Sequence, residues 1–288
     1  YIGWGEQALI RHDLENANEC FNLIVLEGQR RTDNLLLGSG YSAMAHLFSM
    51  QGLPVQASQY IERALVYLRD GPLDEILKAR TRQSIFSAQQ SNITQAVLEV
   101  ENALQLAELV SNPQERYSLA NANYYATLHY AFHADMSNAQ AAAQHAENLA
   151  TELNINELKI KAQIGQGMAA LHSGQNLLAS QFCGTAMQLC ETSYTWWFTL
   201  QTTVLAASTA LAVGRSSLCL EHIHNALTLS EIYKYQGAHG NLYHLKGKVY
   251  LLFGDYKNAQ ACFEEGLALS HPLHFMALNQ HYLGVSLC

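Results

Sequence analysis

Apolar residues return along this chain with the spacing of a helix and, over a longer distance, with the spacing of a repeat. In the stretch from residue 247 to 269, apolar positions recur every three or four residues on both sides of a turn at Gly254, which predicts two amphipathic helices. Small residues, Gly247, Ala259 and Gly266, stand where the two helices would touch. A single helical hairpin cannot bury its own apolar face, so the pattern predicts further copies.

The small residue that opens the second helix of this hairpin recurs along the whole chain. It stands at Ala17, Ala57, Ala96, Ala139, Ala179, Cys219 and Ala259, in steps of 40, 39, 43, 40, 40 and 40 residues. A core position follows four residues later, at Phe21, Ile61, Val100, Ala143, Cys183, Ile223 and Phe263. A second small or apolar contact follows after seven, at Ile24, Ala64, Ala103, Ala146, Ala186, Ala226 and Gly266. An i, i+4, i+7 set lies on one helix face, so these positions are predicted to form the core.

A turn is predicted five residues before each of these small residues. Glycine, which favours a helix C-cap, fills the slot at Gly52, Gly174, Gly214 and Gly254, and other residues fill it at His12, Ser91 and Ala134. Proline placement agrees, because Pro54 lies within a hairpin and the others, Pro72, Pro113 and Pro272, lie between hairpins.

The hairpin at 237–272 resembles the tetratricopeptide repeat (TPR). The family's Trp, Gly, Tyr, Gly, Tyr, Ala, Phe and Ala positions are occupied by Tyr243, Gly247, Tyr250, Gly254, Tyr256, Ala259, Phe263 and Gly266, and the second hairpin matches with Tyr41, Ala45, Phe48, Gly52, Ala57, Ile61 and Ala64. The middle repeats are degenerate at Ser84, Ser87, Thr127 and Ala207. A period near 40 exceeds the usual ~34 residues. It is similar to the long repeats of MalT-type transcription activators and their signal-transducing ATPase relatives, kinesin light chains and bacterial Rap-type regulators.

The resemblance implies an all-α chain, a right-handed superhelical solenoid of about seven helix-turn-helix repeats forming a single domain over residues 1–288. The repeats are predicted at approximately 1–35, 38–72, 77–113, 117–156, 157–195, 196–236 and 237–272, and an eighth helix is predicted to start within 273–288. Solenoid ends usually carry polar caps, and neither end here has one. We therefore expect the chain to be an excerpt of a longer protein.

Composition narrows the classes of partner. The 288 residues are 49% hydrophobic and 14% charged with a net charge of −8, which argues for a folded chain and against direct nucleic-acid binding. The uncharged stretch at 196–213 is interrupted by Thr, Gln and Ser, so it is predicted as a helix packed on protein and not as a membrane span. Six cysteines without a CxxC pair, and no visible signal peptide, favour free thiols in the cytoplasm.

Candidate chemistry is sparse. His129 and His133 share a helix face but lack a third ligand, and Cys183 and Cys190 lie on a packing face, which predicts core thiols. No nucleophile motif, zinc motif or phosphate-binding loop occurs in the sequence. We therefore predict no catalytic residue, no metal site and no cofactor, and we expect that the chain is not an enzyme.

The resemblance also implies a concave face lined by the first helix of each repeat. Carried onto this sequence, the ligand-facing positions are Ser42, His46, Lys78, Thr81, Gln89, Asn121, Tyr124, Lys161, His172, Gln201, Ser208, Asn241, His244 and Lys248. These polar side chains are suited to hold the carboxylates and backbone of a peptide. Tyrosines crowd residues 117–132, where they fill a joint in the core or form part of a docking surface.

Three functions remain open on this evidence. The first is a non-catalytic module that binds a protein or peptide, as the regulatory or sensor region of a larger signalling or transcription-regulating protein. The second is a sensor for a small effector that acts on flanking domains, as the MalT-type resemblance implies. The third is a scaffold subunit that joins an assembly or a second copy of the chain.

Overall fold

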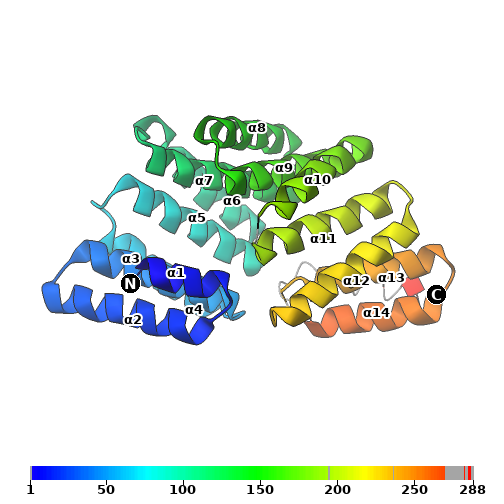
Figure 1. Cartoon of the computed structure of the whole chain (residues 1–288), viewed down its shortest axis with the longest axis horizontal. Coiled ribbons are helices and arrows are strands. Elements are labelled where there is room, and N and C mark those ends of the chain that lie inside the picture. Colours follow the sequence, from blue (N-terminus) through cyan, green and yellow to red (C-terminus); the bar gives the residue numbers. More distant parts are fainter. Residues whose placement is uncertain (1, 194, 236, 270–281, 283–284, 287–288) are drawn as a thin grey trace. The chain divides into compact units, whose positions relative to one another are not determined.

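The computed structural model describes residues 2–193, 195–235, 237–269, 282 and 285–286, and throughout this part of the chain the regular structure is helical, without strands (Figure 1). The all-α prediction is therefore confirmed. The predicted eighth helix at 273–288 lies outside the described residues, apart from Tyr282, Val285 and Ser286, which are helical.

The helices group into two compact units, Tyr1–Leu158 and Lys159–Cys288. Unit 1 holds α1 (Ile2–Ile10), α2 (Leu14–Arg31), α3 (Asn34–Met50), α4 (Pro54–Tyr67), α5 (Leu73–Gln89), α6 (Ile93–Leu104), the short 3-10 helix η1 (Ala107–Leu109), α7 (Pro113–Phe132), α8 (Met136–Leu153) and the start of α9 (Asn156–His172). Unit 2 holds the rest of α9, α10 (Asn176–Glu191), α11 (Trp196–Ala212), α12 (Ser216–Ile232), α13 (His239–Leu252) and α14 (Tyr256–Leu269). A single domain over 1–288 stays a prediction.

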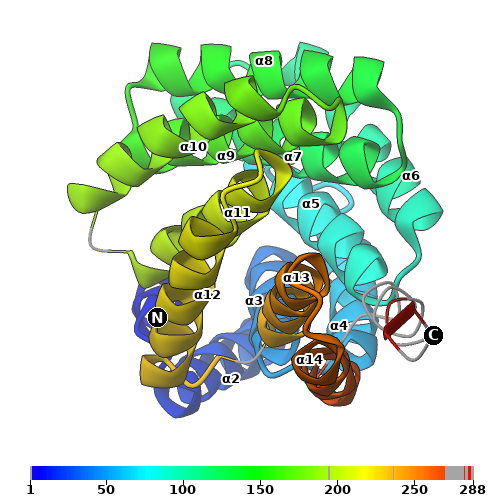
Figure 2. The same ribbon diagram turned by 90° about the vertical axis from the view of Figure 1, so that its right-hand side faces the viewer.

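Within each unit, helices that are consecutive in the chain pack side by side as hairpins. In unit 1, α1 pairs with α2, α3 with α4, α5 with α6 and α7 with α8 (Figures 1 and 2). In unit 2, α11 pairs with α12 and α13 with α14. The predicted step of 43 residues, the longest of the series, has a local cause, because η1 is inserted between α6 and α7.

The predicted core positions are buried in every hairpin. All seven residues that open the second helices, from Ala17 to Ala259, have no exposed surface, and the residues four and seven positions later are buried as well. The hydrophobic effect therefore acts at the same three positions in each hairpin, which is how neighbouring hairpins cover each other's apolar faces.

The predicted turn slots all adopt the left-handed backbone conformation. The glycines of this slot, Gly52, Gly174, Gly214 and Gly254, have φ between 71° and 76°. His12, Ser91 and Ala134 also have positive φ, at 58°, 62° and 63°, although they carry a Cβ. These three positions therefore keep a conformation that is unfavourable for their side chains. The backbone conformation of this slot is therefore set by its position in the repeat, and glycine, the residue best suited to it, is present in only some of the repeats.

Small residues let the first helix approach the second. A Cβ built on Gly247 would lie 2.4 Å from Phe263 Cε1, and one on Gly5 would lie 2.3 Å from Phe21 Cε1. In the degenerate repeats, Ser84 and Thr127 fill this position and are buried. Each hydroxyl donates to a carbonyl of its own helix, at 2.7 and 2.9 Å, so neither is left without a partner.

The least polar predicted helix is α11. In the structure it is packed by protein, with Phe198, Leu200 and Leu205 buried, and Trp196 stacks on Tyr233 with ring centroids 4.6 Å apart. None of the described helices is both long and apolar enough to cross a bilayer.

Candidate functional site

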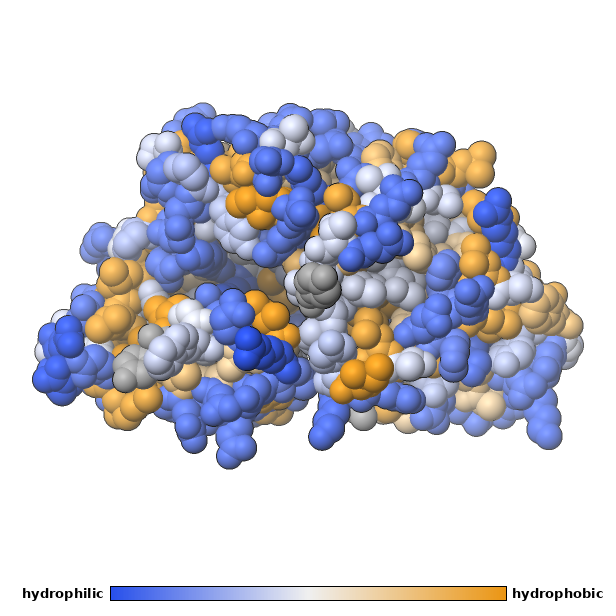
Figure 3. All heavy atoms as spheres, in the orientation of Figure 1, coloured by the Kyte–Doolittle hydropathy of each residue, from blue (hydrophilic) through white to orange (hydrophobic). Residues whose placement is uncertain are grey.

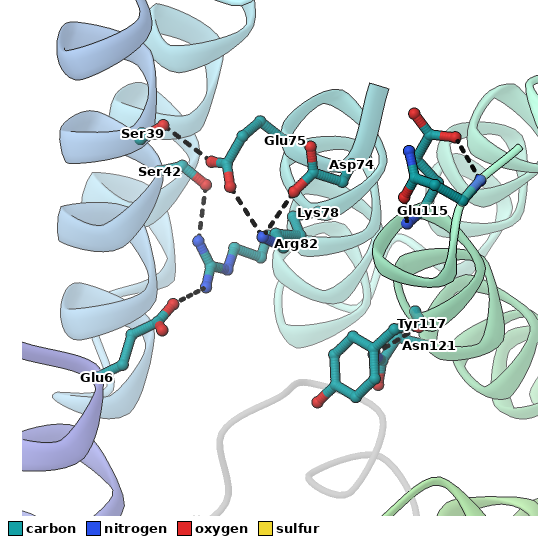
Figure 4. A network of polar contacts seen from close by, with 11 residues as sticks. Glu6, Ser39, Ser42, Asp74, Glu75, Lys78, Arg82, Glu115, Tyr117 and Asn121 are labelled. Carbon is teal, nitrogen blue, oxygen red and sulfur yellow. Dashed lines mark hydrogen bonds and ion pairs between the residues drawn. The ribbon is translucent and has the colours of Figure 1, made fainter. Parts of the chain in front are cut away.

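The first helices of successive hairpins in unit 1 contact one another, α1 with α3, α3 with α5 and α5 with α7. Polar side chains follow this contact line from helix to helix (Figure 4). We call this set the first-helix lane, and it consists of Glu6, Ser39, Ser42, Asp74, Glu75, Lys78, Arg82, Tyr117 and Asn121.

Hydrogen bonds connect neighbouring first helices along the lane. Ser39 Oγ donates to Glu75 Oε2 at 2.9 Å, and Arg82 Nη1 donates to Ser42 Oγ at 2.8 Å. Tyr117 Oη donates to Glu157 Oε1 at 2.9 Å, linking α7 to the start of α9. The bonded residues are 36, 40 and 40 positions apart, close to one repeat. The lane is therefore held by polar bonds that recur with the period of the fold.

One contact reaches across an entire hairpin. Arg82 Nη2 on α5 lies 3.7 Å from Glu6 Oε1 on α1, although α3 lies between these helices in the chain (Figure 4). The Arg82 side chain is only 18% exposed, whereas Glu6 is 46% exposed. Since the pair bypasses α3, α1 and α5 approach each other on the lane side of unit 1.

The centre of the lane is an ion triplet on α5. Lys78 Nζ donates to Glu75 Oε1 at 2.8 Å and to Asp74 Oδ2 at 3.1 Å. Burial lowers the pKa of Lys78, but Glu75 and Asp74 raise it by more, so that the net shift is upward. The ammonium group is therefore charged and bonded to two carboxylates of its own helix.

Three of the predicted ligand-facing residues lie together in the lane, namely Ser42, Lys78 and Asn121 (Figure 4). Ser42 is buried beneath Arg82, and Asn121 Nδ2 donates to Tyr117 O at 3.0 Å. Gln89 accepts a bond from Ser49 Oγ at 2.9 Å, again across neighbouring first helices, and His46 on α3 is half-buried.

Thr81 and Tyr124 differ from the predicted placement on an open face. Both are buried, and the Thr81 hydroxyl donates to Leu77 O at 2.7 Å. Both lie fifteen residues before the small residue that opens the second helix, and Ser42 and His244, at the same place in their repeats, are buried as well, so this position of the repeat is an interior one. Arg82 lies one position beyond Thr81 and Tyr125 one position beyond Tyr124, and both are only partly buried.

In unit 2 the predicted residues are dispersed over three helices, α9, α11 and α13. Lys161 lies over the Phe198 ring at 5.2 Å, and Ser208 Oγ donates to Val204 O at 3.0 Å. His172 is exposed, and Gln201 and Asn241 are half-buried. His244 is buried, contrary to the predicted open placement, because it packs on Phe263 and Tyr282, with ring centroids 6.0 and 5.1 Å apart. Lys248 lies over the same Tyr282 ring at 5.4 Å.

Of the histidine and cysteine candidates, His129, Cys183 and Cys190 are packing residues, whereas His133 is exposed. His129 is buried, its Nε2 lies 3.1 Å from Ser84 Oγ, and burial lowers its pKa to about 4. Cys183 and Cys190 are buried, which confirms the predicted core thiols, and burial raises the pKa of Cys183 to about 11 and raises that of Cys190. Among the described residues, no group of three or more His, Cys, Asp or Glu side chains is arranged to hold a metal ion.

The lane contains residues that the resemblance did not supply, chiefly Glu6, Ser39, Glu75, Arg82 and Tyr117. A signal for the last four was present in the sequence, since they and their bonded partners lie 36 or 40 residues apart. Finding them required a search for hydrogen-bonding pairs at the repeat distance, in addition to a search for apolar positions.

Comparison with solved structures places this chain among TPR-like helical repeat proteins. A tetratricopeptide repeat protein from Parabacteroides merdae is 16% identical, with a TM-score of 0.60, over 100% of this chain and 97% of that one. The apo form of RapI is 10% identical, with a TM-score of 0.70, over 92% of this chain and 94% of that one. A signal transduction ATPase with numerous domains and a tetratricopeptide repeat sensor, from Pyrococcus horikoshii, is 10% identical with a TM-score of 0.59, over 96% of this chain and 43% of that one.

At these identities the likeness defines the fold, and the TPR-like resemblance stated from the sequence is confirmed at that level. No protein-family model matches the sequence, and no curated protein matches it.

Proposed function

We propose that this chain is a non-catalytic repeat module that binds a segment of another protein or a peptide, and that unit 1 does so through the first-helix lane. The observation that carries the proposal is the row of polar side chains on successive first helices, of which all but Ser39 and Ser42 are partly exposed. Apolar packing between hairpins is already complete at the recurring core positions, so stacking alone does not require these polar groups.

The chemistry of the lane suits a peptide. It offers carboxylates, two cations, hydroxyls and an amide, all of which can bond to backbone or side-chain groups of an extended segment. The surface of unit 1 over α1 to α4 mixes hydrophilic with hydrophobic residues (Figure 3), which provides apolar contact area beside polar groups.

We further propose that the module is the regulatory or sensor region of a larger cytoplasmic protein. The structural likeness to an ATPase whose repeat region is described as a sensor supports this role, and so do the free thiols of Cys20, Cys183, Cys190, Cys219 and Cys262. The same likeness favours a second candidate, in which the module senses a small effector. A ligand that binds the folded form raises its melting temperature, so screening of metabolites by thermal shift separates the two.

A display library of random peptides tests the proposal. Selection on the full chain should enrich sequences that lose binding to the double variant Lys78→Ala, Asn121→Ala. The matched control is Arg63→Ala, Asn148→Ala, which removes one cation and one amide from the second helices α4 and α8. Enriched peptides that bind both variants equally, or a library without binders, would overturn the proposed function.

A further inference from the structure

Within each unit, first helices lie against the second helix of the preceding hairpin. In unit 1, α3 contacts α2, α5 contacts α4 and α7 contacts α6, and in unit 2, α11 contacts α10 and α13 contacts α12. One position of the repeat, ten residues before the small residue that opens the second helix, is buried in every first helix from α3 to α13. Its residues are Leu47, Phe86, His129, Ala169, Thr209 and Val249.

The same face of α1 is exposed. Gln7 holds this position in the first hairpin and is exposed, as are Trp4 and Gly3, three and four residues earlier. Trp4 is 73% exposed, whereas the residues at its place in the other six hairpins are buried or half-buried. A Cβ added to Gly3 would meet no atom within 4 Å. Of the seven first helices, α1 therefore presents at its surface a face that the others bury.

The opposite side of α1 is already packed within its own hairpin. Gly5 and Leu9 are buried there, and a Cβ on Gly5 would lie 2.3 Å from Phe21 Cε1 of α2. Beside the exposed face, at the turn between α1 and α2, lies a hollow of about 360 Å³. Its lining residues are Trp4, Gln7, Ala8, Arg11, Asp13 and Asn16.

The second hairpin shows what fills this place one repeat later. The residues equivalent to Trp4, Gln7 and Ala8 are Met44, Leu47 and Phe48 on α3. These three belong to one apolar cluster with residues of α2, chiefly Ala17, Phe21 and Ile24. The hollow beside α1 thus corresponds to the place that a second helix occupies in the next hairpin.

The polarity of Gln7 is compatible with burial under a helix. His129 and Thr209 hold the same position and are also polar, yet both are buried. Thr209 Oγ1 donates to Ala206 O at 3.0 Å, and His129 Nε2 lies 3.1 Å from Ser84 Oγ. A polar side chain at this position is therefore accommodated where it has a hydrogen-bond partner.

The size of the face favours an occupant in the same polypeptide over a separate molecule. Complete burial of a tryptophan removes only ~150–250 Å² from water, whereas a stable complex of separate proteins buries ~800 Å² on each partner. A helix joined by a short loop avoids most of the cost of association. Such loops occur in this chain, since only Thr32 and Asp33 separate α2 from α3.

We propose that a further hairpin of the same repeat precedes α1 in the full-length protein, and that its second helix covers Gly3, Trp4 and Gln7. The small and apolar stripe of that helix would pack on the Trp4 ring, as Ala17, Phe21 and Ile24 pack around Met44 and Leu47. The proposal is independent of peptide binding by the first-helix lane.

The test supplies such a hairpin from the chain's own sequence. A copy of residues 34–79, which holds α3, α4 and the start of α5, is joined ahead of Tyr1, so that the copied Ala57 stands 39 residues before Ala17. The control carries a copy of residues 73–79 only, which lengthens α1 without adding a second helix. Trp196 and Trp197 are replaced by Phe in both proteins, which leaves Trp4 as the sole tryptophan.

Iodide should quench Trp4 fluorescence at least about fivefold less in the hairpin-extended protein than in the control, because a covered indole is shielded from solvent. Gln7→Glu gives a second readout. It should lower the urea midpoint of the extended protein, where it buries a carboxylate, and leave that of the control unchanged. Gln188→Glu, at an exposed place on α10, should leave both proteins unchanged.

Equal quenching of Trp4 in the two proteins, or an equal effect of Gln7→Glu in both, overturns the proposal. A dimer of the unextended chain that depends on Trp4 in light scattering also overturns it, because the face would then belong to a second copy. The residues ahead of Tyr1 in the full-length protein are an independent check. They should place a small residue ~39–43 residues before Ala17 and small or apolar residues four and seven positions later, and a sequence without this pattern overturns the proposal. The proposed peptide binding is unaffected by any of these results.

Discussion

Arg82 Nη1 donates a hydrogen bond to Ser42 Oγ across 40 residues of sequence, which is one repeat. Tyr117 and Glu157 are bonded over the same interval. Bonds between nearly equivalent positions of neighbouring hairpins restrict how one hairpin can slide on the next, in addition to any contribution to stability.

A double-mutant cycle on this pair gives the first prediction. Ser42→Ala and Arg82→Gln are expected to be coupled by about 1 kcal/mol in unfolding free energy, because the bond is charge-assisted and largely shielded from water. Urea denaturation of the four proteins measures the coupling. The exposed pair Arg30 and Glu27 on α2 provides the comparison and should be coupled less. Equal coupling in the two cycles would contradict the prediction.

Gly247→Ala is predicted to destabilise unit 2 by about 1–3 kcal/mol, because the new Cβ would overlap the Phe263 ring. The second substitution Phe263→Leu in the same protein should recover part of the loss. The control is Gly184→Ala, in the exposed part of α10 where a Cβ meets no atom within 4 Å. That change should stabilise the helix by roughly 0.5–1 kcal/mol, since alanine is the better helix former. Chemical denaturation that showed the two alanines to be equivalent would reject the close approach.

Ala134→Gly is predicted to raise the melting temperature. Ala134 has φ of +63° at the turn before α8, and glycine adopts this conformation without the steric cost of a Cβ. The gain in folding free energy should be only about 0.5–1 kcal/mol. Glycine also increases the entropy of the unfolded chain, and this offsets part of the relief of steric strain. The reverse change in the same slot, Gly254→Ala, should lower the melting temperature. Calorimetry that found both changes to have the same sign would be inconsistent with a backbone fixed by the repeat.

His129 predicts a dependence of stability on pH. Burial lowers its pKa to about 4, below the ~6.5 of an unfolded histidine. The unfolded state therefore binds a proton first, and stability is lost as pH falls from about 6.5 to about 4, by about 3 kcal/mol at most. His129→Gln should remove this part of the pH profile, whereas His133→Gln, one turn away and exposed, should leave it. A profile in the two variants that is the same over this range would refute the assignment.

The buried thiols should resist alkylation. With the pKa of Cys183 raised to about 11, only about 0.1% is thiolate at pH 8, and the group is also shielded from reagent. Mass spectrometry after iodoacetamide treatment should show Cys20, which is only partly buried, modified before Cys183 and Cys190. Rapid modification of Cys183 in the folded protein would indicate a more open packing of α10 than the structure has.

Much of the fold could be predicted from the sequence, because apolar residues recur with both the helical period and the repeat period, and both periods mark the buried positions. Ala17 to Ala259 and the turn slots from His12 to Gly254 were placed correctly, including slots without glycine. Whether an apolar residue is buried can be predicted from its own position in the pattern, without knowing which residue it contacts. A periodic search detects it even where Ser84 and Thr127 break the consensus.

The candidate site was less accessible to such a search. Thr81, Tyr124 and His244 turned out to be buried because they share one interior position of the repeat, fifteen residues before the small residue that opens the second helix. The approach of Glu6 to Arg82 depends on how three hairpins curve together, which no local pattern encodes. A polar contact depends on two residues, so predicting it requires the identity of the residue one repeat away as well as that of the residue itself.

Hydrogen exchange of the full chain, with and without a selected peptide, tests the central claim most directly. The account predicts that bound peptide slows amide exchange in α1, α3, α5 and α7, whose side chains form the lane, and leaves α4, α6 and α8 unchanged. Protection confined to α4, α6 and α8 would contradict it, because binding would then use the second helices and the polar bonds along the lane would serve only to join the hairpins.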